Sequence, residues 1–143
     1  MELFFFITGI INSVVLTVIF ILRKKRLDII QRYGWLYLFM AVPAVGGLIL
    51  HVITRSSVQY PFCLGIFFLF LVLEWLFDWN LKINFRKNWL LLTPYLIIYY
   101  AMNYGFVVLP WRYSPGWGVV MLILFILQIA ANFWSETAWK RTG

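Results

Sequence analysis

Cysteine and histidine are scarce in this chain, and their scarcity excludes several kinds of site. The 143 residues include one cysteine, Cys63, and one histidine, His51. A single cysteine excludes an internal disulfide, a Cys-x-x-Cys redox site and a cysteine-based zinc site. A single histidine cannot supply bis-histidine haem ligation, and a His/Met pair would need Met102 at the depth of His51. We therefore expect no cofactor and no metal ion.

Charged residues are also scarce, and acidic ones most of all. They make up 12% of the chain, with 5 Asp and Glu against 12 Lys and Arg, whereas soluble domains average about 25% charged residues. Hydrophobic residues make up 64%, which predicts an integral membrane protein. The basic residues lie in short segments between apolar stretches, so we expect anionic lipid head groups as partners and no nucleic acid.

The sequence also lacks the common catalytic and targeting signatures. It contains no Gly-rich phosphate loop, no HExxH, no G-x-S-x-G and no Asp-rich motif for prenyl or phosphatidyl transfer. The basic cluster at 23–26 follows the first apolar stretch rather than preceding it, so this stretch is expected to be a retained anchor and not a cleaved signal peptide.

Five apolar stretches are each close to the ~20 residues that a helix needs to cross a bilayer. Short connections between them predict one all-α domain over 1–143, an up-down bundle in which successive helices are antiparallel neighbours. The basic stretch 23–33 is expected to be the longest loop. The predicted membrane-spanning helices are at about 3–22, 34–54, 61–79, 89–109 and 117–135.

Basic residues predict the orientation, because Lys and Arg concentrate in cytoplasmic loops. With the N-terminus outside, the outer loops hold only Arg55 and Arg112. The C-terminus is then cytoplasmic, and we expect the chain to lie in the cell membrane. The inner segments hold the other ten basic residues: Arg23, Lys24, Lys25, Arg26, Arg32, Lys82, Arg86, Lys87, Lys140 and Arg141.

Glu74 begins a series of charged residues spaced by four, which share one face if the helix continues. Asp78, Lys82 and Arg86 complete the series. It fits either a salt-bridge ladder at the cytoplasmic interface or a phosphate site in which Lys82, Arg86 and Lys87 contact a lipid head group. Glu74 lies one turn deeper than Asp78, where a carboxyl group is expected to face the bundle interior.

A polar cluster open to the cytoplasm is predicted around Glu74. Gln128 and Asn132 are spaced by four on the last helix, and Thr93 lies just inside the start of the fourth helix at similar depth. We expect Glu74 to lie near Gln128 or Asn132. The cluster of Glu74, Asp78, Thr93, Gln128 and Asn132 either holds the helices together by hydrogen bonds or binds a substrate, ion or proton.

Three further features have two interpretations each. His51 is either packed or a titratable group on the outer side. Tyr95, Tyr99 and Asn103 share one helix face and Tyr100 and Tyr104 an adjacent one, which fits helix packing or stacking on a ring-shaped ligand. Lastly, the second helix carries a proline and two glycines in its middle, which predict a packing notch or a hinge: Pro43, Gly46 and Gly47.

Two function classes remain open. The favoured one is a non-enzymatic membrane component: an accessory subunit, or a small oligomeric transporter or lipid-handling protein. A chain this small is expected to associate with copies of itself or with a larger complex. The alternative is a membrane enzyme that acts on a lipid or isoprenoid with Glu74 as general acid or base. One buried carboxyl group without an evident nucleophile or metal gives that alternative little support.

Overall fold

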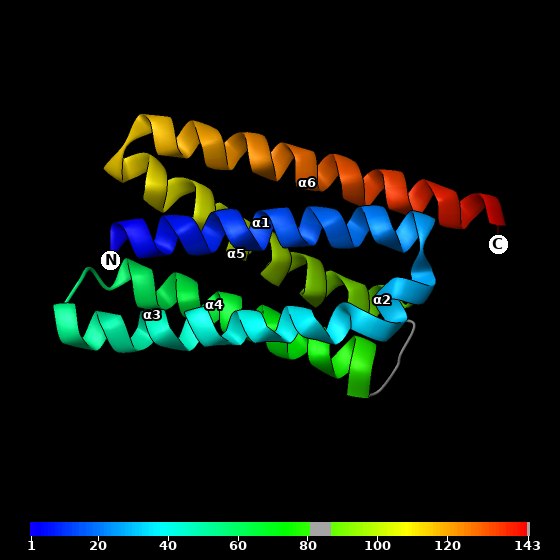
Figure 1. The fold of residues 1–143 in the computed structure, drawn as a ribbon, viewed down its shortest axis with the longest axis horizontal. Helices are drawn as coiled ribbons and strands as arrows, with labels where there is room; N and C mark the ends of the chain where they lie inside the picture. The colour runs from blue at the N-terminus through cyan, green and yellow to red at the C-terminus, as the bar shows by residue number, and fades with distance from the viewer. Residues whose placement is uncertain (81–86, 143) are drawn as a thin grey trace.

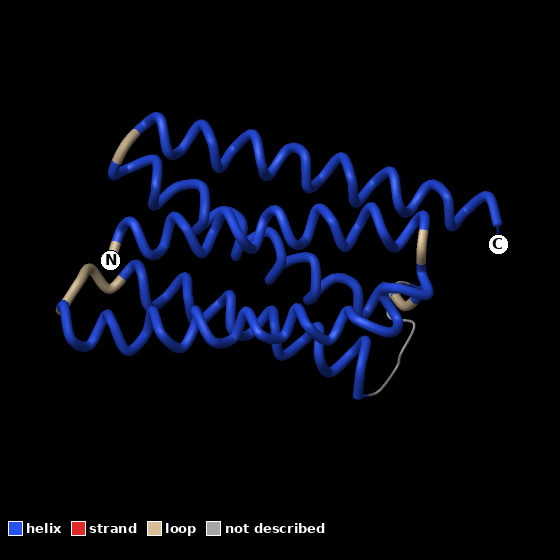
Figure 2. The backbone as a smooth tube through the Cα atoms, viewed as in Figure 1, coloured by secondary structure: helices blue, strands red, loops and turns tan. Residues whose placement is uncertain are grey.

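The computed structural model describes the backbone of residues 1–80 and 87–142, and their side chains except those of residues 27, 78–80 and 136–142. Within these residues the chain is helical apart from short connections (Figure 2). Five helical segments are long and apolar enough to cross a membrane, which confirms the predicted helical class. They are Glu2–Lys25, Asp28–Thr54, Gln59–Phe77, Trp89–Tyr113 and Pro115–Ser135.

The second and third of these segments each combine more than one kind of helix. In chain order the elements are α1 (Glu2–Lys25), α2 (Leu27–Tyr33), the 3₁₀ helix η1 (Gly34–Met40), α3 (Ala41–Thr54), α4 (Gln59–Glu74), the π-helix η2 (Trp75–Asn80), α5 (Trp89–Tyr113) and α6 (Pro115–Thr142).

The basic stretch 23–33 is mostly helical, and the expectation of a loop there is wrong. The first helix continues to Lys25, and α2 begins at Leu27. Lys and Arg are good helix formers, and basic side chains in the last turn of a helix interact favourably with its dipole. Arg23, Lys24 and Lys25 occupy that turn of α1. Charge alone therefore did not predict where the first helix ends.

Pro43 lies near the start of α3 rather than in the middle of one long helix. The chain is 3₁₀ from Gly34 to Met40 and becomes α-helical at Ala41. Proline is tolerated in the first turn of an α-helix, where its missing N–H leaves little unsatisfied. The glycine notch is present one turn later, because a Cβ atom on Gly47 would lie 2.7 Å from Leu64 Cδ1 on α4.

Consecutive long helices run in alternating directions, with the two termini at opposite ends of the bundle (Figure 1). The pairs α3–α4, α4–α5 and α5–α6 pack on one another as expected. Helix α1 also contacts α3 and η1 as expected, but it packs mainly against α6, which was not predicted. Helices α1 and α3 meet at Gly47, where a Cβ atom would lie 2.9 Å from Phe4 Cε1. In Figure 1, α6 lies on one side of α1, and α3 and α4 lie on the other.

Close packing of α1 depends on a glycine facing two other helices. A Cβ atom on Gly9 would lie 2.8 Å from Phe106 Cδ1 on α5 and 2.9 Å from Met121 Cε on α6. The Phe106 ring also lies against Phe5 and Phe67, with centroid distances of 4.9 and 5.3 Å. Small residues let helix backbones approach in membranes, so this aromatic junction explains why α1 sits against α5 and α6.

Candidate functional site

Glu74 ends α4 and lies inside the bundle. The residue is only 8% exposed, and the Tyr95 hydroxyl of α5 donates a hydrogen bond to its Oε1 atom. The neighbouring Phe70 ring lies 5.4 Å from the Tyr95 ring, centroid to centroid. A carboxyl group at this depth needs such a partner, because lipid offers it none.

Gln128 is the second buried polar group of the predicted cluster. It is fully buried, and its Nε2 atom donates to the Tyr99 hydroxyl at 2.6 Å. Its Oε1 atom is buried without a hydrogen-bond partner in the part of the chain that the structure describes. Tyr99 follows Tyr95 by one helical turn on α5, so α5 joins Glu74 of α4 and Gln128 of α6 through successive tyrosines.

A third buried contact joins α1, η1 and α5. Asn12 is fully buried; its Oδ1 atom accepts a hydrogen bond from the Tyr37 hydroxyl at 2.7 Å, and its Nδ2 atom lies 3.9 Å from Met102 Sδ. The Tyr37 ring meets Phe70 edge to face. Each of the five long helical segments therefore contributes to a set of three buried polar contacts that all include a residue of α5. We call this set the buried network: Asn12, Tyr37, Glu74, Tyr95, Tyr99, Met102 and Gln128.

The other predicted members of the cluster are placed differently. Thr93 is half-buried and its hydroxyl donates to the carbonyl of Trp89 on its own helix at 2.8 Å. Asn132 is half-buried, and its backbone carbonyl accepts from the Ser135 hydroxyl at 2.7 Å. The side chain of Asp78 lies outside the described residues. No hydrogen bond among the described side chains joins Glu74 directly to Asn132 or Gln128.

The predicted phosphate contacts are only partly visible. Lys82 and Arg86 lie outside the described residues, whereas Lys87 is exposed just before α5 begins. At the same end of the bundle Lys24 extends from α1 to α6, where its Nζ atom donates to the Trp134 carbonyl at 3.1 Å and lies 3.7 Å from the Trp134 ring centroid. We call this end, where α1 ends and α5 begins, the Arg23 end.

A small cavity lies beside Glu74 at the Arg23 end. It measures about 30 Å³, and Arg23, Tyr37 and Glu74 contribute polar groups to its otherwise apolar lining. A cavity of this size holds one water molecule. The carboxyl group of Glu74 is therefore close to a space that admits a water molecule.

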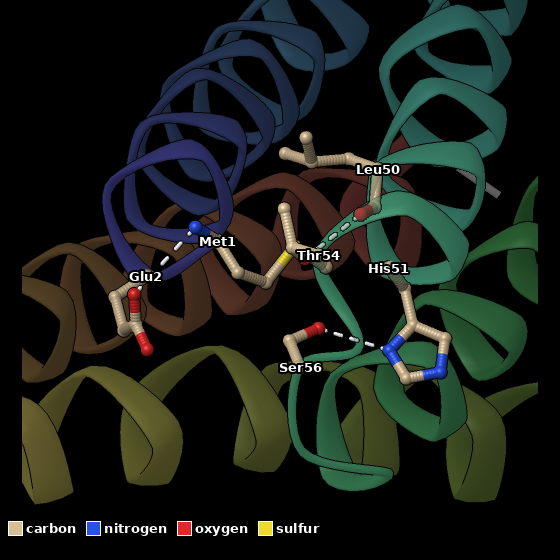
Figure 3. A network of polar contacts seen from close by, with 6 residues as sticks. All are labelled: Met1, Glu2, Leu50, His51, Thr54 and Ser56. Carbon is tan, nitrogen blue, oxygen red and sulfur yellow. Dashed lines mark hydrogen bonds and ion pairs between the residues drawn. The ribbon is translucent and has the colours of Figure 1, made fainter.

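His51 lies at the opposite end, which we call the Arg112 end because α5 ends there. The ring is half-buried, and its Nδ1 atom lies 2.9 Å from Ser56 Oγ (Figure 3). Between them Arg55 ends α3 with a left-handed backbone, at φ 47°. Figure 3 also shows the first residues of α1 at this end, with the Met1 amine 3.5 Å from Glu2 Oε2. His51 thus stabilises a tight turn locally.

A large groove on the side of the bundle was missed by the sequence analysis. It measures about 890 Å³ and lies between α4, α5 and α6. Its lining is almost wholly apolar and includes Phe62, Cys63 and Ile66 of α4, Tyr104 of α5, and Leu122 and Phe125 of α6. One of the two tyrosine faces predicted from spacing lies here, because Tyr100 and Tyr104 both line the groove. The other face, with Tyr95 and Tyr99, is buried.

Small residues on α5 form the floor of this groove. Ala101 and Gly105 both line it and are one helical turn apart. A Cβ atom on Gly105 would lie 2.7 Å from Cys63 Sγ, so α4 and α5 are in close contact at that point. A pair of small residues spaced by four on an aromatic-rich helix was the signal that could have indicated the groove.

In the described part of the chain, no group of three or more His, Cys, Asp or Glu residues is placed to hold a metal ion. Comparison with known protein families, curated proteins and solved structures found no match to this chain.

Proposed function

We propose that this protein is a non-enzymatic lipid-handling component of the cell membrane. The groove between α4, α5 and α6 carries the proposal. Its volume of about 890 Å³ falls in the range typical of small-molecule sites, about 300–1,000 Å³. An apolar groove on a membrane-spanning bundle is complementary to a hydrocarbon chain, and we assign it to one chain of a bilayer lipid.

The buried network holds the bundle together in this proposal. Its hydrogen bonds run between helices, and each such contact in a membrane contributes about 0.6 kcal/mol. Because Tyr95 and Tyr99 extend from the same helix that forms the groove floor, the network also fixes the position of α5. Glu74 and Gln128 therefore act on the groove only by positioning that helix.

The alternative function is an enzyme that uses Glu74 as acid or base on a lipid or isoprenoid. A catalytic acid or base must come within hydrogen-bond reach of the substrate. The described cavity beside Glu74 measures about 30 Å³, far less than the volume of an isoprenoid. The described lining of the groove contains no Asp, Glu or His. Both observations favour binding over catalysis.

We further propose that the Arg23 end faces the cytoplasm and the Arg112 end faces outside, as the positive-inside rule requires. The groove then opens laterally toward the outer half of the bilayer. Exposed apolar side chains cover much of the remaining surface, including Val52, Ile97 and Phe133. Such a surface suits lipid or neighbouring subunits, and association with copies of the chain or a larger complex is part of the proposal.

The lipid assignment is tested by filling the groove. Ala101→Trp places a large ring on its floor, whereas Ile97→Trp places the same ring one turn away at a residue that is 63% exposed and outside the groove. Native mass spectrometry of protein extracted in native lipid should show a bound lipid on the wild type and on Ile97→Trp, and little on Ala101→Trp.

Two results would contradict the proposal. One is a bound lipid retained equally by Ala101→Trp, which would place the lipid elsewhere. The other is chemical conversion of the lipid by the purified wild-type chain, which would make the protein an enzyme.

A further inference from the structure

We infer that the groove selects an anionic phospholipid and that Arg112 binds its phosphate. The inference rests on the proposed lipid-binding function and adds the class of head group. Arg112 is the charged residue in the described lining of the groove, and it lies in the last turn of α5.

Arg112 is held in place for such a contact. Its Nη1 atom donates to Gln59 Oε1 at 3.1 Å. Gln59 is the first residue of α4 and also lines the groove. A guanidinium group has five N–H donors in a fixed plane. The Gln59 contact uses one of them and orients the plane, which leaves donors for a phosphate. Phosphate and guanidinium form paired, charge-assisted hydrogen bonds.

The depth of Arg112 matches a head group rather than a hydrocarbon chain. Trp111 and Tyr113 flank it in sequence, and both are exposed. Tryptophan and tyrosine at the end of a membrane-spanning helix typically lie at head-group level. A chain in the groove would therefore run along α5 toward Phe125 while its phosphate stays beside Arg112.

The charges around the groove favour a head group without a cation. The described lining has a positive charge on Arg112 and no Asp or Glu to accept the amine of a zwitterionic head group. An anionic lipid supplies the phosphate and adds no positive charge near Arg112. A basic residue near a membrane surface contributes about 1 kcal/mol toward an anionic lipid, and a paired contact adds to this.

The site differs from the predicted head-group contacts, of which the structure describes Lys87, at the opposite end of the bundle. It joins one basic side chain to a groove of defined volume, so it binds a single lipid molecule. The basic residues of the Arg23 end, by contrast, face a membrane surface with many head groups.

The test compares lipids that differ only in their head group. The purified protein is titrated with dioleoyl phosphatidylglycerol or dioleoyl phosphatidylcholine in nanodiscs or detergent, and bound lipid is counted by native mass spectrometry. The wild type should prefer the anionic lipid about five- to tenfold. Arg112→Gln should lose that preference and still bind both lipids weakly through the groove.

Two further variants separate charge, geometry and folding. Arg55→Gln removes the other basic residue at the Arg112 end, which is exposed and outside the groove lining, and should keep the preference. Arg112→Lys keeps the charge but not the planar donors, and should keep a reduced preference. Both are expected to fold as the wild type does, because both side chains are exposed.

The outcomes distinguish this inference from the proposed function. The head-group assignment is overturned if the wild type binds the two lipids equally, or if Arg112→Gln keeps the preference. The proposed groove is still supported in that case if Ala101→Trp displaces the lipid. Lipid binding unaffected by Ala101→Trp overturns both. A dimer that Ala101→Trp dissociates would show that a second copy of the chain occupies the groove, and would also overturn both.

Discussion

Substituting Gly9 by alanine should destabilise the bundle, because the glycine lies where three helices meet. The added Cβ atom would lie 2.8 Å from Phe106 Cδ1 and 2.9 Å from Met121 Cε, well inside the ~3.5–4.0 Å of ordinary carbon contacts. The Met121 methyl group can rotate away. The Phe106 ring cannot move easily, because it is 1% exposed and contacts Phe5 and Phe67.

The size of the effect follows from this packing. Forcing an extra methyl group into a filled core costs about 1–3 kcal/mol, and we expect Gly9→Ala to lower the free energy of unfolding by about 2 kcal/mol. The matched control is Gly65→Ala on α4, where a Cβ atom meets nothing within 4 Å. This control should leave stability unchanged or raise it by up to about 1 kcal/mol, through better helix propensity.

The measurement is the free energy of unfolding in bicelles, obtained by steric trapping or by denaturing titration with SDS. The difference between the two variants is the informative quantity, since both replace glycine by alanine inside a helix. Equal stabilities for Gly9→Ala and Gly65→Ala would refute the close contact of α1 with α5 and α6.

Three other predictions test the network and the orientation. Glu74→Leu should lower the free energy of unfolding by about 1–2 kcal/mol, because it removes the acceptor of the Tyr95 hydroxyl. Glu74→Gln keeps an acceptor and should lower the free energy of unfolding by less. Equal losses of stability in the two variants would contradict the contact between Glu74 and Tyr95. Asn12→Leu should lower the free energy of unfolding by about 0.6–1.7 kcal/mol, measured in the same way, and an unchanged stability would argue against the Asn12 hydrogen bonds. In a cysteine-free background on intact cells, an impermeant thiol reagent should label Gly116→Cys and leave Lys87→Cys unlabelled; the reverse pattern would invert the orientation.

Much of the fold was predictable from hydropathy, because crossing a bilayer requires a minimum length of apolar helix. All five stretches lie within a few residues of the helices in the structure. The helix α2 was not predicted, because seven residues that include Asp28 and Arg32 have neither the length nor the apolarity that identifies a span. Residues 34–40 were predicted as part of a span, but hydropathy does not distinguish a 3₁₀ helix from an α-helix. Helix order alone also gave no indication that α1 packs on α6, which depends on the fit of Gly9 against Phe106.

Of the candidate site, the sequence predicted only which tyrosines share a helix face. Spacing by four separated the buried Tyr95 and Tyr99 from the exposed Tyr100 and Tyr104, since these positions follow the helical repeat. Spacing within one helix carries no information about the partner helix, so the pairing of Glu74 with Tyr95 could not be read from it. The groove is harder still, because it exists where side chains of three helices leave space unfilled.

In the proposed function a lipid chain occupies the groove between α4, α5 and α6. A density map of the protein in native-lipid nanodiscs tests it most directly. Our account predicts elongated density along Cys63 and Tyr104 that ends at Arg112. An empty groove, or a groove filled by a second copy of the chain, would contradict this prediction. Non-protein density beside Glu74 in place of density in the groove would contradict it as well.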